Sequence, residues 1–253
     1  MPDKILVTVS SKGIGREIAK VFYDNNWNVC ITSRSNINLK DLTRGWSDNN
    51  CQLLDFKVDF TNSLEILELK KYLKHKWGNL DTLVVNVGSG KGEKRLTSKF
   101  VNNRINFQEN FNSAFHTVSL LKELLLTSKN PTIIFIGSIA AIKNVNSPLS
   151  YAMAKKSIEN FSKYTSIQLS TFGIRVNCLQ LGHIFTESNA WVQKAKTDPI
   201  GLQNFVNKVT LTKKIIKPAE VADLVFFLIN SSYFKNLNGS TITFDSGSTL
   251  IHG

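Results

Sequence analysis

A hydroxyl, a phenol and an ammonium group occur at a spacing that suits proton transfer. Ser138 follows the apolar run 131–136, which is typical of a strand buried on both faces. Tyr151 and Lys155 lie four residues apart at the start of a helical pattern, so both side chains project from one helix face. Because open α/β folds bind ligands at the carboxyl ends of their strands, we expect the three groups to meet there.

These residue types suit general acid–base chemistry. A phenol has an ordinary pKa near ~10, and a nearby ammonium group lowers that pKa toward the working range. The Ser138 hydroxyl can hold and polarise a substrate carbonyl. The alternative is that Tyr151 and Lys155 are only a pair on a helix surface. The other motifs of the chain favour the first interpretation.

Short apolar runs alternate with helix-length segments along the whole chain. We predict strands at 5–9, 29–33, 52–58, 82–85, 132–136, 175–179 and 241–244, and helices at 14–25, 63–76, 105–127, 151–171 and 219–231. Alternating β and α elements predict a three-layer, doubly wound Rossmann α/β fold with a mostly parallel seven-stranded sheet. No linker or repeat divides the chain, which predicts one domain over 1–253, and the polar segment 182–214 is predicted to be a substrate lid.

The turn after the first strand has the composition of a dinucleotide cradle. There the backbone approaches a pyrophosphate, which lies on the N-terminus of the next helix. The alternative is a tight strand-to-helix turn with no ligand. The candidate cofactor-binding residues of this turn are Thr8, Ser10, Ser11, Lys12, Gly13, Ile14 and Gly15.

The end of the second strand predicts the cofactor. An acidic residue about 20 positions after the glycines would bind a ribose 2′-hydroxyl, but residues 32–35 contain none. Arg34 can instead face a 2′-phosphate, and Lys12 can share that charge. We therefore predict a preference for NADP(H), with NAD(H) as the alternative cofactor. The other interpretation is that both residues are solvated cations.

Two further loops are candidate cofactor contacts. Asp59, after the third strand, can accept a hydrogen bond from an adenine amino group, although Asn62 and Glu65 nearby suggest helix capping instead. After the fourth strand, Asn86 and Gly88 form a turn where backbone can approach the cofactor. The alternative is a glycine-rich loop without a ligand.

The composition is that of a globular protein with one large core. The chain has 253 residues, of which 42% are hydrophobic and 20% are charged, and its apolar runs are too short to span a bilayer. The net charge of +12 accompanies no nucleic-acid-binding motif. Three separated cysteines and no visible signal peptide favour a reducing, cytoplasmic location without a metal site. We therefore expect no nucleic-acid or membrane partner.

Together these motifs resemble the short-chain dehydrogenase/reductase family over nearly the whole chain. The segments that carry the resemblance are 8–15, 85–88, Asn110, Ser138, Tyr151 with Lys155, 175–177, 181–186, 217–222 and 245–247. The resemblance implies that Tyr151 is the general acid in carbonyl reduction, that Lys155 lowers the phenol pKa and binds the nicotinamide ribose, and that Ser138 positions the carbonyl. It also implies that Asn110 supports a relay water and that Gly182, Ile184 and Thr186 contact the cofactor. Family members are commonly tetramers, so we expect a homo-oligomer, either a tetramer or a dimer.

The chain departs from the family pattern in its loops and not in the catalytic four. Val9 replaces a family glycine, so either the turn uses ordinary dihedral angles or cofactor binding is weakened. Val85 and Val87 alter the motif after the fourth strand, Leu181 replaces a proline, and Ser246 replaces a glycine.

Three functions compete on this evidence. The first is an NADP(H)-dependent carbonyl reductase or alcohol dehydrogenase, similar to 3-oxoacyl-carrier-protein reductases, since a basic surface suits an acidic carrier protein. The second is a sugar or polysaccharide-precursor reductase of the same family, and the third is a non-catalytic nucleotide-binding descendant. Specificity is expected in the loops 89–103, 140–149 and 182–214.

Overall fold

The computed structural model describes residues 2–90, 100–186 and 190–251 of the chain. It has a seven-stranded parallel sheet in the order β3-β2-β1-β4-β5-β6-β7. The strands are β1 (Lys4–Val7), β2 (Asn28–Ser33), β3 (Leu53–Lys57), β4 (Thr82–Val85), β5 (Thr132–Ile136), β6 (Arg175–Leu181) and β7 (Thr241–Phe244). The predicted doubly wound fold is confirmed, and every strand pair is parallel.

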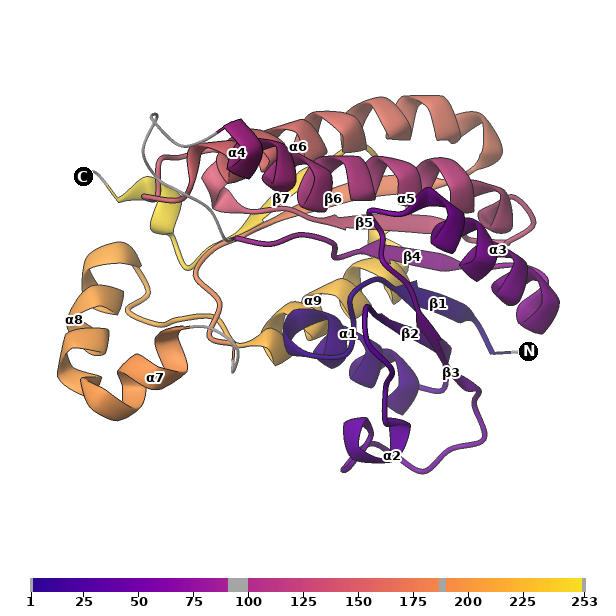
Figure 1. Ribbon diagram of the computed structural model, residues 1–253, viewed down its shortest axis with the longest axis horizontal. Coiled ribbons are helices and arrows are strands. Elements are labelled where there is room, and N and C mark those ends of the chain that lie inside the picture. Colours follow the sequence, from indigo (N-terminus) through magenta and orange to yellow (C-terminus); the bar gives the residue numbers. More distant parts are fainter. Residues whose placement is uncertain (1, 91–99, 187–189, 252–253) are drawn as a thin grey trace.

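Helices cover both faces of the sheet, as Figure 1 shows. One face carries α3 (Ser63–Trp77), α4 (Phe100–Phe107), α5 (Ser113–Leu121) and α6 (Leu149–Leu169), and the other carries α1 (Gly13–Asp24) and α9 (Pro218–Asn230). The short α2 (Leu39–Leu42) follows β2, and α7 (Ala190–Thr197) with α8 (Pro199–Val209) stands apart from the layers.

The two cores follow from the period of two along the strands. On β1, Leu6 packs with the α3, α5 and α6 side, whereas Ile5 and Val7 pack with the α1 and α9 side. All three side chains are fully buried. Because both faces of the sheet are covered there, the central strands β1, β4 and β5 are nearly continuous apolar runs.

Three expectations need correction. The predicted helix 105–127 is interrupted, because a π-helical turn at Gln108–Asn112 separates α4 from α5 and a 3₁₀ turn follows α5. β6 runs two residues beyond its predicted end, to Leu181, because it pairs with β7 as far as Phe244. The predicted lid contains α7 and α8, which polar composition had hidden, although its residues 187–189 lie outside the described part of the chain.

Local signals explain where several helices begin and end. Asn62 caps α3, since its side chain accepts a hydrogen bond from the N–H of Leu64 at 3.0 Å. Gly78 ends that helix with a φ of 78°. Asp198 caps α8 through the N–H of Gly201 at 2.8 Å. No helix in the described ranges is long and apolar enough to span a membrane.

Candidate active site

The glycine-rich loop has a left-handed turn at a β-branched residue. Val9 has a φ of 51°, and Gly13 has a φ of 58°. The N–H of Val9 donates to Thr32 Oγ1 at 2.9 Å, and its carbonyl accepts from Asn86 Nδ2 at 3.2 Å. Of the two alternatives for Val9, ordinary dihedral angles are excluded, since hydrogen bonds from two neighbouring strand ends hold a left-handed turn. The other alternative, weakened cofactor binding, stays a prediction.

Thr8 and Ser10 brace this loop from within. Both are fully buried. Thr8 Oγ1 accepts from the N–H of Asn86 at 2.7 Å, and Ser10 Oγ donates to the Val7 carbonyl at 2.7 Å. The side chains of Thr8, Ser10 and Asn86 therefore shape the cradle, and the contacts that we predicted for them with a cofactor stay predictions.

Two glycines mark places where the backbone leaves no room for a side chain. A Cβ at Gly15 would lie 2.5 Å from the Val9 carbonyl oxygen, so α1 begins directly against the loop. Gly88 has a φ of 137°, and a Cβ there would lie 2.2 Å from Asn110 Oδ1. The two glycines thus allow α1 to approach the loop after β1, and Asn110 to approach the turn after β4, more closely than any side chain would permit.

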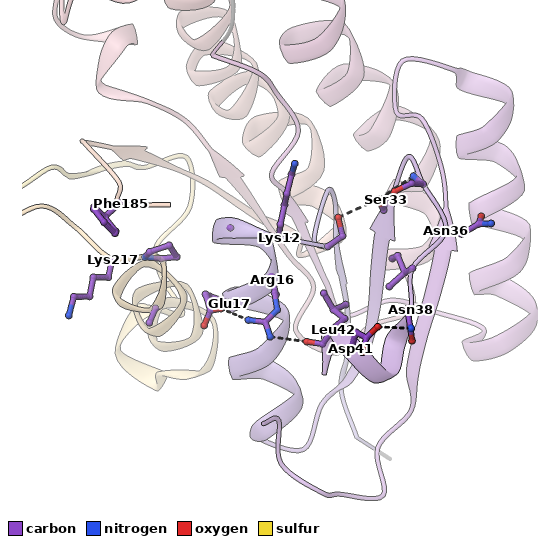
Figure 2. A pocket seen from close by; sticks show the side chains of 16 residues that line it. Lys12, Arg16, Glu17, Ser33, Asn36, Asn38, Asp41, Leu42, Phe185 and Lys217 are labelled. Carbon is purple, nitrogen blue, oxygen red and sulfur yellow. Dashed lines mark hydrogen bonds and ion pairs between the residues drawn. The ribbon is translucent and has the colours of Figure 1, made fainter. Parts of the chain in front are cut away.

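Two cavities flank the loop. The smaller, about 360 Å³, is lined by Ser11, Lys12, Arg34, Asp59 and Gly88 among others. The larger, about 1000 Å³, brings Lys12 and Arg16 opposite Lys217 and Phe185 (Figure 2). Arg16 and Lys217 were missed by the sequence analysis, although Arg16 lies one helical turn after Lys12, a spacing that places both on one face.

Arg34 lies at the rim of the smaller cavity. Its side chain is 70% exposed, and its Nη1 lies 3.6 Å from Glu109 Oε1. The hydroxyls of Ser11, Ser33 and Ser35 form a chain beside it, with both Oγ–Oγ distances at 3.3 Å. Hydroxyls and an exposed guanidinium group fit a phosphate, and the ion pair with Glu109 is a weak competitor because it is solvated.

Asp59 lies in the turn before α3 and also lines the smaller cavity. Its Oδ1 accepts from the N–H and the hydroxyl of Thr61, at 2.9 and 2.8 Å, and its N–H donates to Glu65 at 2.7 Å. This is the turn that leads into α3, as the capping alternative predicted. Asp59 also lines the smaller cavity, so the geometry leaves its predicted contact with an adenine group open.

The catalytic candidates meet where β5 ends and α6 begins. Lys155 is 5% exposed, and its Nζ donates to the carbonyls of Ile136 at 3.0 Å and Val87 at 3.4 Å. The same Nζ lies 5.8 Å from the centre of the Tyr151 ring. Ser138 forms a hydrogen bond with the Tyr151 hydroxyl. The structure thus brings Ser138, Tyr151 and Lys155 together, as their spacing predicted.

The pKa values of these groups follow from burial. Burial raises the pKa of Tyr151, and the hydrogen bond with Ser138 only partly offsets this. Our expectation of a lowered phenol pKa is therefore wrong for the chain without a ligand. Burial lowers the pKa of Lys155 to about 8, and the nearby Cys178 slightly opposes that shift. With a pKa of about 8, Lys155 is a cation below that pH and neutral above it.

Asn110 lies in the π-helical turn and is fully buried. Its Nδ2 donates to the carbonyls of Asn106 at 3.0 Å and Ser89 at 3.1 Å. The first of these bonds competes with the helix backbone, which favours a widened turn. Its Oδ1 is buried without a partner, and an orphaned acceptor beside Gly88 fits a bound water or ligand.

The segment after β6 closes over the glycine-rich loop. A Cβ at Gly182 would lie 2.6 Å from Asp245 Cα, and Ile184 forms a parallel bridge with Ile216. The Thr186 methyl group lies 3.8 Å from the position that a Cβ at Gly13 would take. Of these three predicted cofactor contacts, Thr186 thus lies beside the glycine-rich loop, whereas Gly182 packs against Asp245 and Ile184 pairs with Ile216.

Comparisons with known proteins show which family the chain is similar to. The family model described as "Enoyl-(Acyl carrier protein) reductase" matches residues 8–249. The 3-oxoacyl-[acyl-carrier-protein] reductase FabG of Chlamydia muridarum is 27% identical over 246 residues, covering 96% of this chain and 95% of that protein. A tropinone reductase homologue of Arabidopsis thaliana is 27% identical over 250 residues, covering 97% and 93%.

A solved structure has the same fold. The L-sorbose reductase of Gluconobacter frateurii, complexed with NADPH and L-sorbose, superposes with a TM-score of 0.89 at 22% identity, covering 98% of this chain and 97% of that one. With the family model spanning nearly the whole chain, the protein belongs to the short-chain dehydrogenase/reductase family. The enzymes of this family are NAD(P)-dependent and act on carbonyl and alcohol groups.

Proposed function

We propose that the chain is an NADP(H)-dependent reductase that converts a carbonyl to an alcohol, or catalyses the reverse reaction, through Ser138, Tyr151, Lys155 and Asn110. The observation that carries the proposal is the buried Lys155 ammonium group beside the Tyr151 phenol, at the mouth of a dinucleotide cradle. A buried cation is costly, and a chain without acid–base chemistry gains nothing from one at this position.

The preference for NADP(H) rests on the charge around the cradle. Lys12 and Arg34 line the smaller cavity, together with the hydroxyls of Ser11, Ser33 and Ser35. No carboxylate follows β2 at the position where one would bind a ribose 2′-hydroxyl. The relatives described as ElxO with NADP bound and L-sorbose reductase with NADPH support the same choice.

Each residue has a distinct role in the proposed reaction. The bound cofactor supplies the hydride, and Tyr151 donates a proton to the carbonyl oxygen. Ser138, already hydrogen-bonded to Tyr151, holds that oxygen in reach of the phenol. Lys155 stabilises the phenolate that remains, and Asn110 Oδ1 offers an acceptor for a relay water. The chain thereby provides orientation and a proton.

The substrate that fits best is a 3-oxoacyl thioester on an acidic carrier protein. Residues 190–217 contain six lysines and a single acidic residue, Asp198. This segment extends from the site (Figure 1), and such a charge attracts an anionic partner. A ketose is the second candidate, favoured by the fold shared with L-sorbose reductase.

We further propose that the chain forms one domain, that it assembles as a homo-oligomer and that it is located in the cytoplasm.

The test is a pair of titrations followed by a substrate panel. Nucleotide fluorescence is expected to show tighter binding of NADPH than of NADH. NADPH oxidation is then measured with acetoacetyl-CoA, L-sorbose and a cyclic dione. Binding without turnover on any carbonyl would favour the non-catalytic alternative, and absence of binding would overturn the proposal.

A further inference from the structure

Gln180 links the end of one strand to the helix that carries Tyr151 and Lys155. It lies on β6 and is fully buried. Its Oε1 accepts from the N–H of Ser138 at 2.5 Å, and its Nε2 donates to Glu159 Oε2 at 3.4 Å. A buried amide with both ends bonded joins β5, β6 and α6 directly behind the catalytic candidates.

The two partners fix the orientation of the Gln180 amide. The N–H of Ser138 can only donate, and an ionised Glu159 can only accept. The amide oxygen must therefore face Ser138 and the amide nitrogen must face Glu159. A protonated Glu159 could also donate a hydrogen bond, so the preference for this orientation of the Gln180 amide would weaken if Glu159 lost its charge.

A glycine makes room for the Gln180 side chain. A Cβ at Gly137 would lie 2.4 Å from Gln180 Oε1 and 3.0 Å from Cys178 Sγ. No other residue type fits beside the amide without displacing it. Gly137 and Gln180 therefore form a matched pair on neighbouring strands.

Glu159 is held in its ionised form by two lysines. Its side chain is 8% exposed, and it pairs with Lys156 at 2.8 Å and Lys163 at 2.9 Å. Burial alone would raise the pKa of Glu159, but the bonds and charges of the two lysines outweigh burial and lower it. The carboxylate therefore offers Gln180 a permanent acceptor at neutral pH.

Ser138 needs this support because it follows the end of a strand. The N–H of Gly137 donates to the Leu179 carbonyl at 2.7 Å, which continues the ladder between β5 and β6. Ser138 lies beyond the last paired residue of β5, has a φ of −155°, and its Oγ accepts from the N–H of Ala140 at 3.2 Å. The Gln180 side chain fixes the serine backbone, and with it the direction of the Oγ toward Tyr151.

We propose that Gln180, oriented by Glu159, is a positioning residue that holds the Ser138 hydroxyl in line with Tyr151. The inference rests on the proposed function, because it assigns Ser138 a part in the reaction. Gln180 itself touches neither substrate nor cofactor. Its contribution to the reaction passes through the backbone N–H of Ser138, which donates to Gln180 Oε1.

The test compares Gln180→Leu with a matched control. Asn177→Leu also removes a buried amide of β6, whose Nδ2 donates to Leu237 at 2.9 Å and whose Oδ1 accepts from Ser240 at 3.0 Å, both far from Ser138. NADPH oxidation with acetoacetyl-CoA as the probe is expected to fall roughly tenfold to hundredfold in kcat for Gln180→Leu, with the Kd for NADPH unchanged. Asn177→Leu is expected to lower the melting temperature while leaving kcat near its original value.

A double-variant experiment separates positioning from general damage. If Gln180 acts through Ser138, adding Gln180→Leu to Ser138→Ala causes little further loss of kcat. If the kcat losses of the two single variants multiply in the double variant, the inference is overturned. Should Gln180→Leu fail to fold, Glu159→Gln keeps the shape and removes the charge that orients the amide, so a smaller loss of kcat is expected from it.

Hydrogen exchange at the Ser138 amide gives a readout without turnover. The amide is expected to exchange faster in Gln180→Leu than in the unmodified chain, and to stay protected in Asn177→Leu. Absence of turnover by the unmodified chain overturns the proposed function, whereas turnover with equal kcat losses in both variants overturns this inference alone. Unchanged exchange at Ser138 also overturns it.

Discussion

The glycine-rich loop and the catalytic cluster differ in how well their residue types suit the positions that they occupy. In the loop, Val9 is a poor residue for its conformation, yet it has a φ of 51°. Such a conformation costs a β-branched residue about 1–2 kcal/mol, and Thr32 and Asn86 hold it in place. In the cluster of Ser138, Tyr151, Lys155 and Asn110, every residue type is the one that the family pattern predicts, yet Asn110 Oδ1 lacks a partner among the described residues and burial raises the Tyr151 pKa.

The difference shows that the two regions place different requirements on their residues. The loop needs a shape, and neighbouring hydrogen bonds can impose that shape on a residue that does not favour it. The cluster needs particular functional groups, and no neighbour can substitute for a phenol or an ammonium group. Substitutions should therefore be severe in the cluster and mild in the loop, except where the loop has no space.

The largest effect is expected from Tyr151→Phe. Removing the phenol leaves no proton donor for the carbonyl oxygen, so kcat should fall about a thousandfold. NADPH affinity should be retained, because the glycine-rich loop is untouched. Steady-state kinetics with a nucleotide titration check both parts. Substantial turnover by this variant would mean that another group is the acid.

Gly88→Ala is expected to have the next largest effect. A Cβ there would lie 2.2 Å from Asn110 Oδ1 and 3.1 Å from Lys155 Nζ, at a φ of 137°. NADPH binding should weaken about a hundredfold, and the melting temperature should fall. Gly90→Ala is the matched control, since no atom of the described part of the chain lies within 4 Å of its added Cβ. Similar losses in both variants would contradict the steric explanation.

The pH dependence tests the buried ammonium group. Since burial lowers the pKa of Lys155 to about 8, the group is a cation below that pH and neutral above it. Carbonyl reduction should therefore decline by about tenfold per pH unit once the pH exceeds about 8. In Lys155→Met, kcat should be low at every pH, and this decline should vanish. A pH–rate profile of both proteins measures it.

Arg34→Ala separates the two cofactors. Removing the guanidinium group should weaken NADPH binding about tenfold and leave NADH binding nearly unchanged, because only NADPH carries the 2′-phosphate. The same titration on Arg44→Ala serves as a control, since Arg44 is an exposed arginine that lines neither cavity. Equal losses for NADPH and NADH in Arg34→Ala would remove the reason for preferring NADP(H).

The smallest effect is expected from Val9→Gly. Because the loop already has the left-handed turn, NADPH affinity and kcat should change by no more than a few-fold. Thr32→Val removes the acceptor for the Val9 N–H and should weaken NADPH binding more than Val9→Gly does. A larger loss of NADPH binding in Val9→Gly than in Thr32→Val would show that the valine side chain, rather than the hydrogen bond to Thr32, determines the conformation of the loop.

Sequence patterns predicted the strands closely, because both faces of the sheet are covered and the central strands are short apolar runs. They also placed Ser138, Tyr151 and Lys155 together, since the sheet edge and the helix period determine where those side chains lie. They could not show that Val9 keeps a positive φ, because Thr32 and Asn86, which hold that turn by hydrogen bonds, lie far from it in the sequence. They also missed Gln180, whose partners Ser138 and Glu159 lie 42 and 21 residues away.

The π-helical turn at Gln108–Asn112 makes the position of Asn110 sensitive to the number of residues between α4 and α5. Each residue of a regular α-helix turns the chain by about 100°, and a π turn accommodates one residue more than an α turn. Deletion of one residue other than Asn110 from this turn would let a regular α-helix run through it, so the flanking helices could keep their faces while Asn110 left its place beside Gly88. A lineage could thus lose the position of this candidate residue through a single-codon deletion, without any substitution at Asn110 itself.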